Sequence, residues 1–331
     1  MELIIYYLFL PTILALSLII AGLFFYKYVI YYNRTHKKYF QDKKVQKFCW
    51  YIRRGKIDKL KQLLDEGVDI NTKGSNGLTP LIWLIYYNFK TKKILRSLKF
   101  LLENGADPFV EFEKMYDYNF VQLASAIKSP EYLKIFLEVY KPTVRELDKH
   151  KNSYNSPAIT QTIFYDRLIQ FKMLLGYGVN VNFKNSITGR NILNNNGHHW
   201  KYAYRLLKAG ADWSNVSKSH RKSESVKPED RNRPDYLCFI ESIKHPSYVV
   251  AKNKGVDYFQ KVVSFLRKHG AKFKLNLDPK EKYQKINGEE VLFFKEDGKW
   301  QEYTKTKQYK KDLKTFRPSI LERIAEKINQ F

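Results

Sequence analysis

The sequence predicts an all-α solenoid of about six degenerate repeat units, preceded by one transmembrane helix and followed by a small β-hairpin and helix cap. Three observations lead to this fold class. An uncharged apolar run opens the chain, a helical phrase recurs between residues 60 and 273, and a hairpin pattern follows its last copy. They divide the chain into residues 1–32 (transmembrane helix and interface), 33–44 (basic juxtamembrane linker), 45–273 (repeat array) and 274–331 (C-terminal hairpin and helical cap).

The first element is the apolar run Leu3–Phe25, whose 23 residues include no charged side chain. As a helix it would be about 34 Å long, which is enough to cross the hydrocarbon core of a bilayer. A cleaved signal peptide is the alternative, but no basic residues precede the run, and its length exceeds that of a signal sequence. We therefore expect a retained single-pass anchor.

Charge beside the anchor predicts its orientation. Residues 27–62 contain twelve Lys or Arg against two Asp, and the positive-inside rule then places the rest of the chain in the cytoplasm. An extracytoplasmic orientation remains the alternative, because the whole chain is basic. The expected location is the plasma (inner) membrane.

The chain as a whole has 59 Lys plus Arg against 33 Asp plus Glu, a formal net charge of +26. This balance favours an anionic partner, namely membrane lipid, nucleic acid or an acidic protein surface. A composition bias that leaves a solvated basic surface is the alternative. Basic residues next to the anchor are expected to contact anionic lipid headgroups: Lys27, Arg34, Lys37, Lys38, Lys43 and Lys44.

The repeated phrase is an apolar helix that ends, in five of six copies, in glycine and a short extended piece. Successive copies begin 38, 35, 38, 32 and 59 residues apart. A period in the thirties with two helices per repeat is typical of a solenoid, in which each repeat buries its apolar face against its neighbours. The copies are LKQLLDEGVDIN (60–71), LKFLLENGADPF (98–109), LKIFLEVYKPTV (133–144), FKMLLGYGVNVN (171–182), AYRLLKAGADWS (203–214) and VVSFLRKHGAKF (262–273).

Residues 76–85, NGLTPLIWLI, read as the start of a helix. Thr79 is a suitable N-cap, and Pro80 fits the first helical position because its missing N–H has no partner there. We expect Trp83 in this helix to face the core.

These residues resemble the ankyrin-repeat family. The resemblance rests on Gly-Leu-Thr-Pro-Leu at 77–81 and on Gly-Ala-Asp at 105–107 and 210–212, and it covers residues 45–273. The sequence departs from the family in several places. Ile82 replaces the usual His, the third repeat has Asn-Phe-Val at 119–121 and no terminal Gly, and the fifth has a short first helix at 190–196.

The resemblance implies that a protein partner meets the finger tips and the first helices. The residues that match these positions are Ser75, Asn76, Leu78, Tyr86, Tyr87, Tyr116, Asp117 and Tyr118. Tyrosine is a suitable anchor because it offers a large, stiff contact area with one polar tip. Packing of Tyr86 and Tyr87 on adjacent repeats is the structural alternative.

Two segments lie outside the repeat pattern. Residues 214–235 are a polar insertion, which we expect to form an extended, mobile finger. Residues 274–331 contain two apolar–polar runs joined at Asp297-Gly298, a strong hairpin pattern, followed by a basic helix, Pro318 and a final amphipathic helix. Such a tail would cap the open end of the solenoid.

The sequence contains no pattern that predicts catalysis. It has no Gly-x-Ser-x-Gly, no phosphate-binding loop and no His-Glu-x-x-His. His198 and His199 would point about 100° apart on a helix, which is unsuitable for a shared metal. Cys49 and Cys238 lie in apolar helical contexts and are expected in the core. We therefore expect a protein that is not an enzyme and that has no catalytic residues, metal or cofactor.

The sequence thus predicts a membrane-anchored module that holds one protein partner, with an acidic surface, at the bilayer. A sharper form is an immunity or inhibitor protein that neutralises a toxic effector, which suits an extracytoplasmic array better than a cytoplasmic one. The alternatives are a basic protein that binds nucleic acid or anionic lipid, and a secreted effector directed at a host membrane. Direct nucleic-acid binding is disfavoured, because the chain has no nucleic-acid-binding motif.

Overall fold

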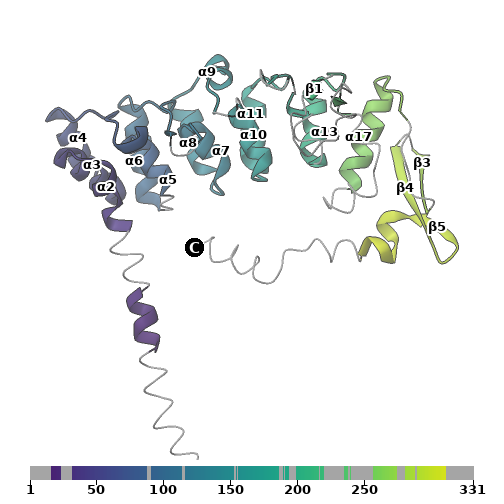
Figure 1. Ribbon diagram of the computed structural model, residues 1–331, viewed down its shortest axis with the longest axis horizontal. Coiled ribbons are helices and arrows are strands. Elements are labelled where there is room, and N and C mark those ends of the chain that lie inside the picture. The colour runs from purple at the N-terminus through teal and green to yellow at the C-terminus, as the bar shows by residue number, and fades with distance from the viewer. Residues whose placement is uncertain are drawn as a thin grey trace, which may run out of the picture. The chain divides into compact units, whose positions relative to one another are not determined.

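The computed structural model describes residues 16–23, 32–87, 91–113, 116–152, 154, 156–185, 189, 191–193, 199–215, 217–219, 235–237, 239, 256–273, 280–287 and 289–310. The described chain is mostly helical and includes a small three-stranded sheet. It divides into an N-terminal unit, Met1–Met173, and a C-terminal unit, Leu174–Phe331 (Figure 1).

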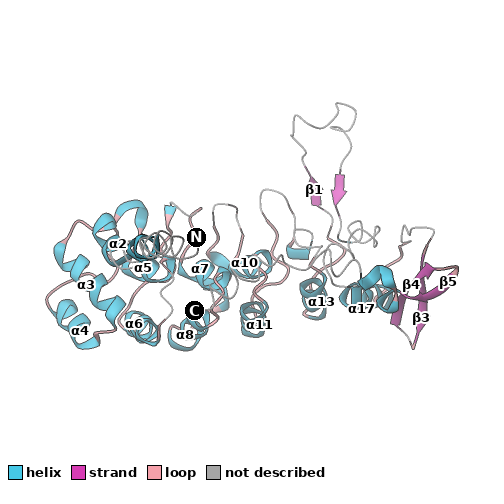
Figure 2. Ribbon diagram, turned by 90° about the horizontal axis from the view of Figure 1, so that it is seen from below, coloured by secondary structure: helices cyan, strands magenta, loops and turns pink. Residues whose placement is uncertain are grey.

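Helices of the N-terminal unit come in consecutive pairs, as the repeated phrase predicted. In Figure 2, α5, α7 and α10 lie in one row and α6 and α8 in a second; α5 packs on α7, α7 packs on α10, and α6 packs on α8. A short additional helix, α9 (Val144–Lys149), separates the last two pairs. The pairs are α3 (Lys43–Arg54) with α4 (Ile57–Asp65), α5 (Pro80–Tyr86) with α6 (Lys92–Glu103), α7 (Phe120–Ala126) with α8 (Glu131–Val139), and α10 (Ala158–Phe164) with α11 (Leu168–Tyr177), which continues beyond Met173.

Capping explains where the first helices begin. Thr79 Oγ1 accepts the Ile82 N–H at 3.3 Å, with Pro80 at the first helical position of α5. In the third repeat, Asn119 and Gln122 form a reciprocal capping box, each side chain accepting the other's backbone N–H at 3.0 Å. The Asn-Phe-Val sequence therefore caps α7 as Thr-Pro-Leu caps α5.

Glycines end the second helices in the left-handed conformation that the sequence predicted. A residue with a side chain would be strained at these φ values, whereas glycine adopts them freely. The φ angles are 85° at Gly67, 84° at Gly105, 94° at Gly178, 86° at Gly210 and 88° at Gly270.

The segment 33–44, predicted to be a basic linker, instead contains helix α2 (Tyr32–Tyr39). His36 and Tyr39 of this helix and the following residue, Phe40, are buried, and their i, i+3, i+4 spacing is that of one helix face. Gly74 lies against the C-terminal end of α2. A Cβ atom added at Gly74 would lie 2.5 Å from the Tyr39 carbonyl oxygen, so only glycine fits there. The segment assigned to the linker is therefore partly helical and partly buried, and its role as a linker stays a prediction.

Of the predicted span Leu3–Phe25, only residues 16–23 are described, and they are helical. The remainder, together with Lys27, lies outside the described residues. Within the part of the chain that the structure describes, no helix combines the length and apolar character needed to cross a bilayer.

In the C-terminal unit, α13 (Trp200–Lys208) packs on α17 (Val256–Lys268), and α17 packs on β4 (Glu289–Glu296). These helices are the second helices of the fifth and sixth repeats. Buried Trp200 contacts Phe259 at 4.9 Å between ring centroids. Residues 194–198, which include the last three residues of the predicted short helix (190–196) and His198, fall outside the described residues.

The polar insertion begins and ends in a short antiparallel pair, β1 (Ser217–Ser219) with β2 (Asp235–Leu237). Ser217 pairs with Leu237, so the two ends of the insertion lie side by side. Residues 220–234 lie outside the described residues, and the predicted mobility of this segment stays a prediction.

The predicted hairpin is present as β4 and β5 (Lys299–Glu302), joined by Asp297 (φ 50°) and Gly298 (φ 81°). A third strand, β3 (Glu281–Ile286), pairs antiparallel with β4 and was not predicted. Because β4 packs on α17, the sheet covers the last described helix of the array, as a cap would. Residues 311–331, including Pro318 and the predicted final helix, are not among those described.

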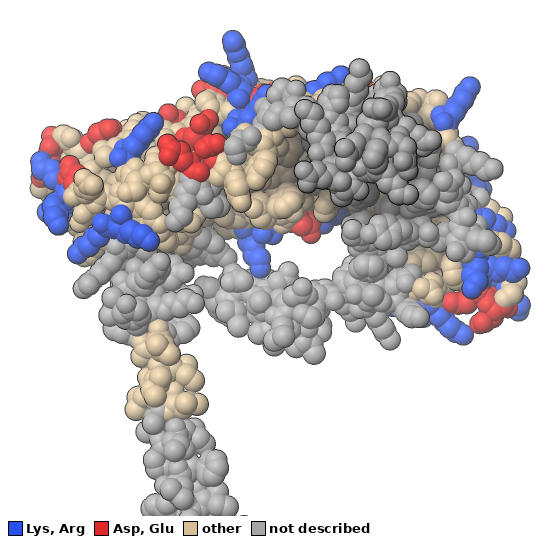
Figure 3. All heavy atoms as spheres, viewed as in Figure 1, with Lys and Arg blue, Asp and Glu red and all other residues tan. Residues whose placement is uncertain are grey.

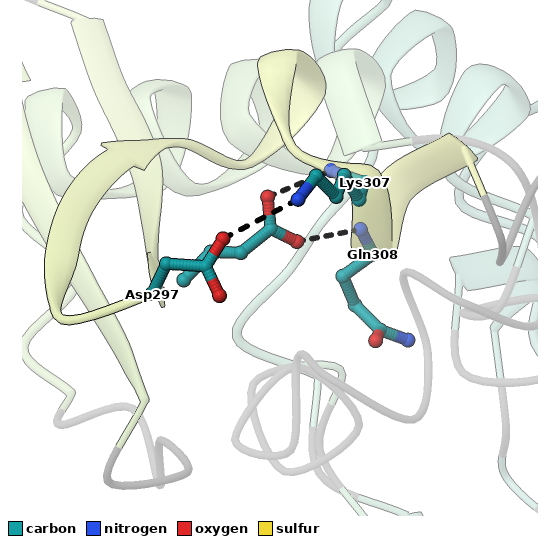
Figure 4. A network of polar contacts seen from close by, with 4 residues as sticks. Asp297, Lys307 and Gln308 are labelled. Carbon is teal, nitrogen blue, oxygen red and sulfur yellow. Dashed lines mark hydrogen bonds and ion pairs between the residues drawn. The ribbon is translucent and has the colours of Figure 1, made fainter.

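A polar network joins this sheet to the start of the basic segment that follows it (Figure 4). The Glu296 carboxylate accepts the backbone N–H groups of Lys307 and Gln308, each at 3.0 Å. Lys307 also forms an ion pair with Asp297 at 3.4 Å. An acidic side chain at a helix start stabilises its unpaired N–H groups.

Candidate protein-binding surface

The first predicted finger is a tight loop closed by a hydrogen bond from Gly74 N–H to the Leu78 carbonyl at 2.8 Å. Asn76 lies at its tip with φ 59°, and both Ser75 and Asn76 are exposed. Leu78 is completely buried, so its prediction as a partner contact was wrong.

The second finger is a small hairpin held by an antiparallel bridge between Phe112 and Tyr118. Tyr116 and Asp117, with φ 53° and 57°, form its tip, and Tyr116 is 57% exposed. Tyr118 is buried and donates its hydroxyl to Gln161 Oε1 at 2.7 Å. Burial, with a smaller contribution from the neighbouring Tyr165, raises the pKa of Tyr118 to about 12. Its prediction as a partner contact was therefore also wrong.

Tyr86 and Tyr87 are half-buried at the end of α5. The Tyr86 ring lies 5.2 Å from Phe112 of the second finger, and the Tyr87 ring lies 6.1 Å from Tyr39 of α2. Both side chains therefore pack on adjacent elements, as the structural alternative held, and still keep part of their surface accessible.

Near these fingers and helix ends, three exposed aromatic residues were not predicted from the sequence. Phe164 and Tyr165, at the end of α10, are 73% and 38% exposed, and Tyr154 is 56% exposed with its ring 5.2 Å from Tyr116. A pattern in the sequence does mark the first two. IFYD at 163–166 spans the end of the first helix of the fourth repeat. IYYN at 85–88 spans the end of the first helix of the second repeat in the same way.

We define the aromatic surface by the accessible aromatic residues of these fingers and helix ends: Tyr86, Tyr87, Tyr116, Tyr154, Phe164 and Tyr165. They are linked to one another through Phe112, which contacts Tyr86 and bridges to Tyr118, and through Tyr118, which neighbours Tyr116 and Tyr165. Rigid aromatic side chains of this kind lose little conformational entropy on binding.

The first two repeats are held in register by an asparagine clamp. Asn71 Nδ2 donates to the Gly105 carbonyl at 3.0 Å, and Asn71 Oδ1 accepts the Asp107 N–H at 2.8 Å. The C-terminal unit repeats this arrangement. Asn182 bonds the Gly210 carbonyl at 3.0 Å and the Asp212 N–H at 2.6 Å.

An aromatic cluster takes the place of the clamp after the second repeat. Phe109 stands where Asn71 and Asn182 stand in their phrases, and its ring stacks on His150 at 4.3 Å. It also contacts Phe136 and Tyr140. A capping box at Thr143 starts α9, which brings His150 into this position. Phe109, which precedes the second finger in the sequence, is thus packed against α8 and the end of α9.

Among the predicted lipid-contact residues, Lys37, Lys38, Lys43 and Lys44 are exposed on α2 and α3. Lys27 and the side chain of Arg34 are not described. Figure 3 shows Lys and Arg side chains at many places on the face in view, and Asp and Glu side chains at fewer places. Glu111 and Glu113 are exposed in the second finger, so the aromatic surface itself includes acidic neighbours.

No group of three or more His, Cys, Asp or Glu suited to a metal occurs among the described residues. His199 is the N-cap residue of α13, and its side chain forms no capping hydrogen bond. Cys49 is a free, fully buried cysteine, and burial raises the pKa of its thiol. It is a core residue, as predicted, as is Trp83. Cys238 lies outside the described residues.

No protein-family model and no curated protein matches the sequence. Among solved structures, the chain is similar to the ankyrin repeat domain of Bcl-3, a member of the IkappaB family, with 15% identity and a TM-score of 0.49 over 68% of this chain and 86% of that one. It is also similar to EF0377, an ankyrin repeat protein, with 17% identity and a TM-score of 0.47 over 68% and 98%. The repeat architecture rests on this chain's own helix pairs, left-handed glycines and asparagine clamps.

Proposed function

We propose that this chain is a membrane-anchored binding module, not an enzyme, and that its aromatic surface holds one protein partner at the bilayer. The observation that carries the proposal is the exposure of Phe164, Tyr116 and Tyr154 on a packed helical framework. Aromatic residues are enriched among the few side chains that provide most of the energy of a protein interface.

The proposed anchor is the uncharged run Leu3–Phe25. Its described part supports this role, because five large apolar side chains between Leu16 and Leu23 are 58–65% exposed. Such side chains favour a lipid environment over water. The exposed lysines of α2 and α3 follow this segment, where cations attract anionic headgroups by about 1 kcal/mol each.

The charge of the chain supports a partner with an acidic surface. A net charge of +26 would raise the association rate with such a partner and make it dependent on ionic strength. Because Glu111 and Glu113 lie in the second finger, we place this attraction on the surrounding basic surface and the specific contact on the aromatic rings.

Site-specific photo-crosslinking tests the proposal. A photoreactive phenylalanine analogue at Phe164 or Tyr116 should trap one protein in intact cells, and the same analogue at exposed Lys134 on α8 should not. The trapped protein, once purified, should bind the full chain in neutral detergent with an affinity that the double variant Tyr116→Ala/Phe164→Ala lowers by about tenfold or more. Equal trapping at all three positions would refute the aromatic surface as the contact.

Orientation is tested separately, with a tag after Phe331 and protease added outside intact cells whose outer barrier has been opened. A protected tag supports the cytoplasmic orientation that the charges beside the anchor favour. Loss of the tag would place the array outside. The inhibitor role is a sharper form of the same proposal, and it requires that the trapped protein be a toxic effector that this chain neutralises.

A further inference from the structure

A basic pocket lies in the C-terminal unit, apart from the aromatic surface. Its volume is about 730 Å³, and α13, α17 and β3, which are visible in Figure 1, contribute to its lining. One lysine comes from α13, three cations from α17 and one lysine from β3. These residues are Lys208, Lys261, Arg267, Lys268 and Lys285.

None of the described residues that line this pocket is Asp or Glu. No carboxylate of any described residue forms an ion pair with Lys208, Lys261, Lys268 or Lys285. The fold therefore gathers cations from segments up to 77 positions apart, Lys208 to Lys285, around one hollow. A concave surface lined by one sign of charge concentrates the field and attracts a ligand of the opposite sign.

Helix termini account for only part of this arrangement. Arg267 and Lys268 lie in the last turn of α17 and Lys208 in that of α13, where cations stabilise the helix dipole. Lys261 lies in the middle of α17 and Lys285 on a strand, so neither has that role. Both are exposed, and their positions add to the repulsion among the other cations.

The size of the pocket points to a small molecule. Its volume falls within the roughly 300–1,000 Å³ that is usual for small-ligand sites. Lysine and arginine together are suited to phosphate, which arginine binds through two parallel hydrogen bonds and lysine as a point charge. Tyr204 and Phe265 add aromatic surface against which a ring can lie, and Ser264 adds a hydroxyl.

We propose that this pocket binds a small ligand that carries several phosphate groups on a ring-sized scaffold. Two sources share this chemistry: a free polyphosphorylated solute and the headgroup of a phosphorylated lipid. The proposal is independent of the aromatic surface, since it concerns different elements in a different unit.

The test uses the full chain in neutral detergent at physiological ionic strength. The soluble probe is inositol hexakisphosphate, followed by titration calorimetry, and the lipid probe is dioctanoyl phosphatidylinositol bisphosphate. The variant Lys261→Gln/Lys285→Gln should weaken binding by about tenfold or more. The matched control Lys299→Gln/Lys310→Gln removes the same charge from exposed positions outside the pocket, and should change affinity by less than about twofold.

Saturable binding of either probe that depends on Lys261 and Lys285 supports the site, and the tighter probe identifies the source. Absence of saturable binding by both probes would overturn the proposal. Equal weakening by the pocket variant and its control would also overturn it, because diffuse charge would then explain the binding. The same holds if a single-stranded oligonucleotide binds as tightly as either probe and is affected equally by both variants.

Discussion

The asparagine clamp between the first two repeats gives a prediction with a defined size. Asn71→Ala removes two hydrogen bonds, from Nδ2 to the Gly105 carbonyl and from the Asp107 N–H to Oδ1. A neutral hydrogen bond contributes about 0.5–1.5 kcal/mol net. Because both bonds are partly accessible to water, which replaces them on mutation, we expect a loss of about 1–2 kcal/mol in the free energy of unfolding.

Urea denaturation of the full chain in neutral detergent, followed by tryptophan fluorescence, measures this loss, since Trp83 and Trp200 are buried in the folded state. The substitution Asn71→Asp retains the acceptor oxygen and removes the donor, so it should retain part of the stability that alanine loses. Hydrogen exchange gives an independent measurement, since the Asp107 amide should exchange faster in Asn71→Ala than in the wild type.

The same substitution at Asn182 is the matched test in the C-terminal unit, where the two bonds are 3.0 and 2.6 Å. We expect a loss of similar size, measured by exchange of the Asp212 amide. A change below about 0.3 kcal/mol for Asn71→Ala, together with unaltered exchange of Asp107, would refute the clamp as a source of stability.

Three further predictions concern burial, pH and a turn. Leu78→Ala should destabilise the chain by about 2–4 kcal/mol in urea denaturation because Leu78 is fully buried, whereas Ser75→Ala in the same finger should cost below about 0.5 kcal/mol. Burial and the nearby cations lower the pKa of His36 from 6.5 to about 4. Between these two pH values the unfolded chain binds a proton at His36 that the folded chain does not bind. Stability should therefore fall by about 2 kcal/mol from pH 7 to pH 5, and His36→Phe should remove most of that dependence; an unchanged pH profile in the variant would contradict the assignment. Gly298→Ala should cost about 1–2 kcal/mol in the unfolding free energy because φ is 81° there although the space is open, and Lys299→Ala beside it should be nearly neutral.

Local sequence patterns predicted the helix pairs well because each pattern acts within its own repeat. Glycine at the end of a helix has a local cause, the left-handed φ, and all five predicted glycines adopt it. Helix α9 and strand β3 were not predicted, although each has a local sequence pattern that marks its start or its end. Thr143 and Glu146 form the capping box that starts α9, and Asn287-Gly288 follows β3 as Asp297-Gly298 follows β4.

The candidate surface was harder to predict because exposure depends on contacts distant in the sequence. Leu78 and Tyr118 match finger positions, yet each is turned inward, and Tyr118 finds its partner at Gln161, 43 residues away. Phe164 looks like a core residue of an apolar helix, yet it lies on the surface at the helix end. A match to a finger position therefore does not show by itself whether a side chain is exposed.

The clamp also sets a rule for how such an array can grow by gene duplication. A repeat whose phrase ends in asparagine presents one donor and one acceptor, and a following Gly-x-Asp loop presents their complements through backbone atoms alone. A duplicated repeat of this kind would form the same two hydrogen bonds with its copy, while its helices would still have to pack on the helices of that copy. Phe109 breaks that interchangeability, because its stacking partner His150 is supplied by one particular helix, α9. The order of repeats around Phe109 is therefore more constrained than the order at a clamped junction.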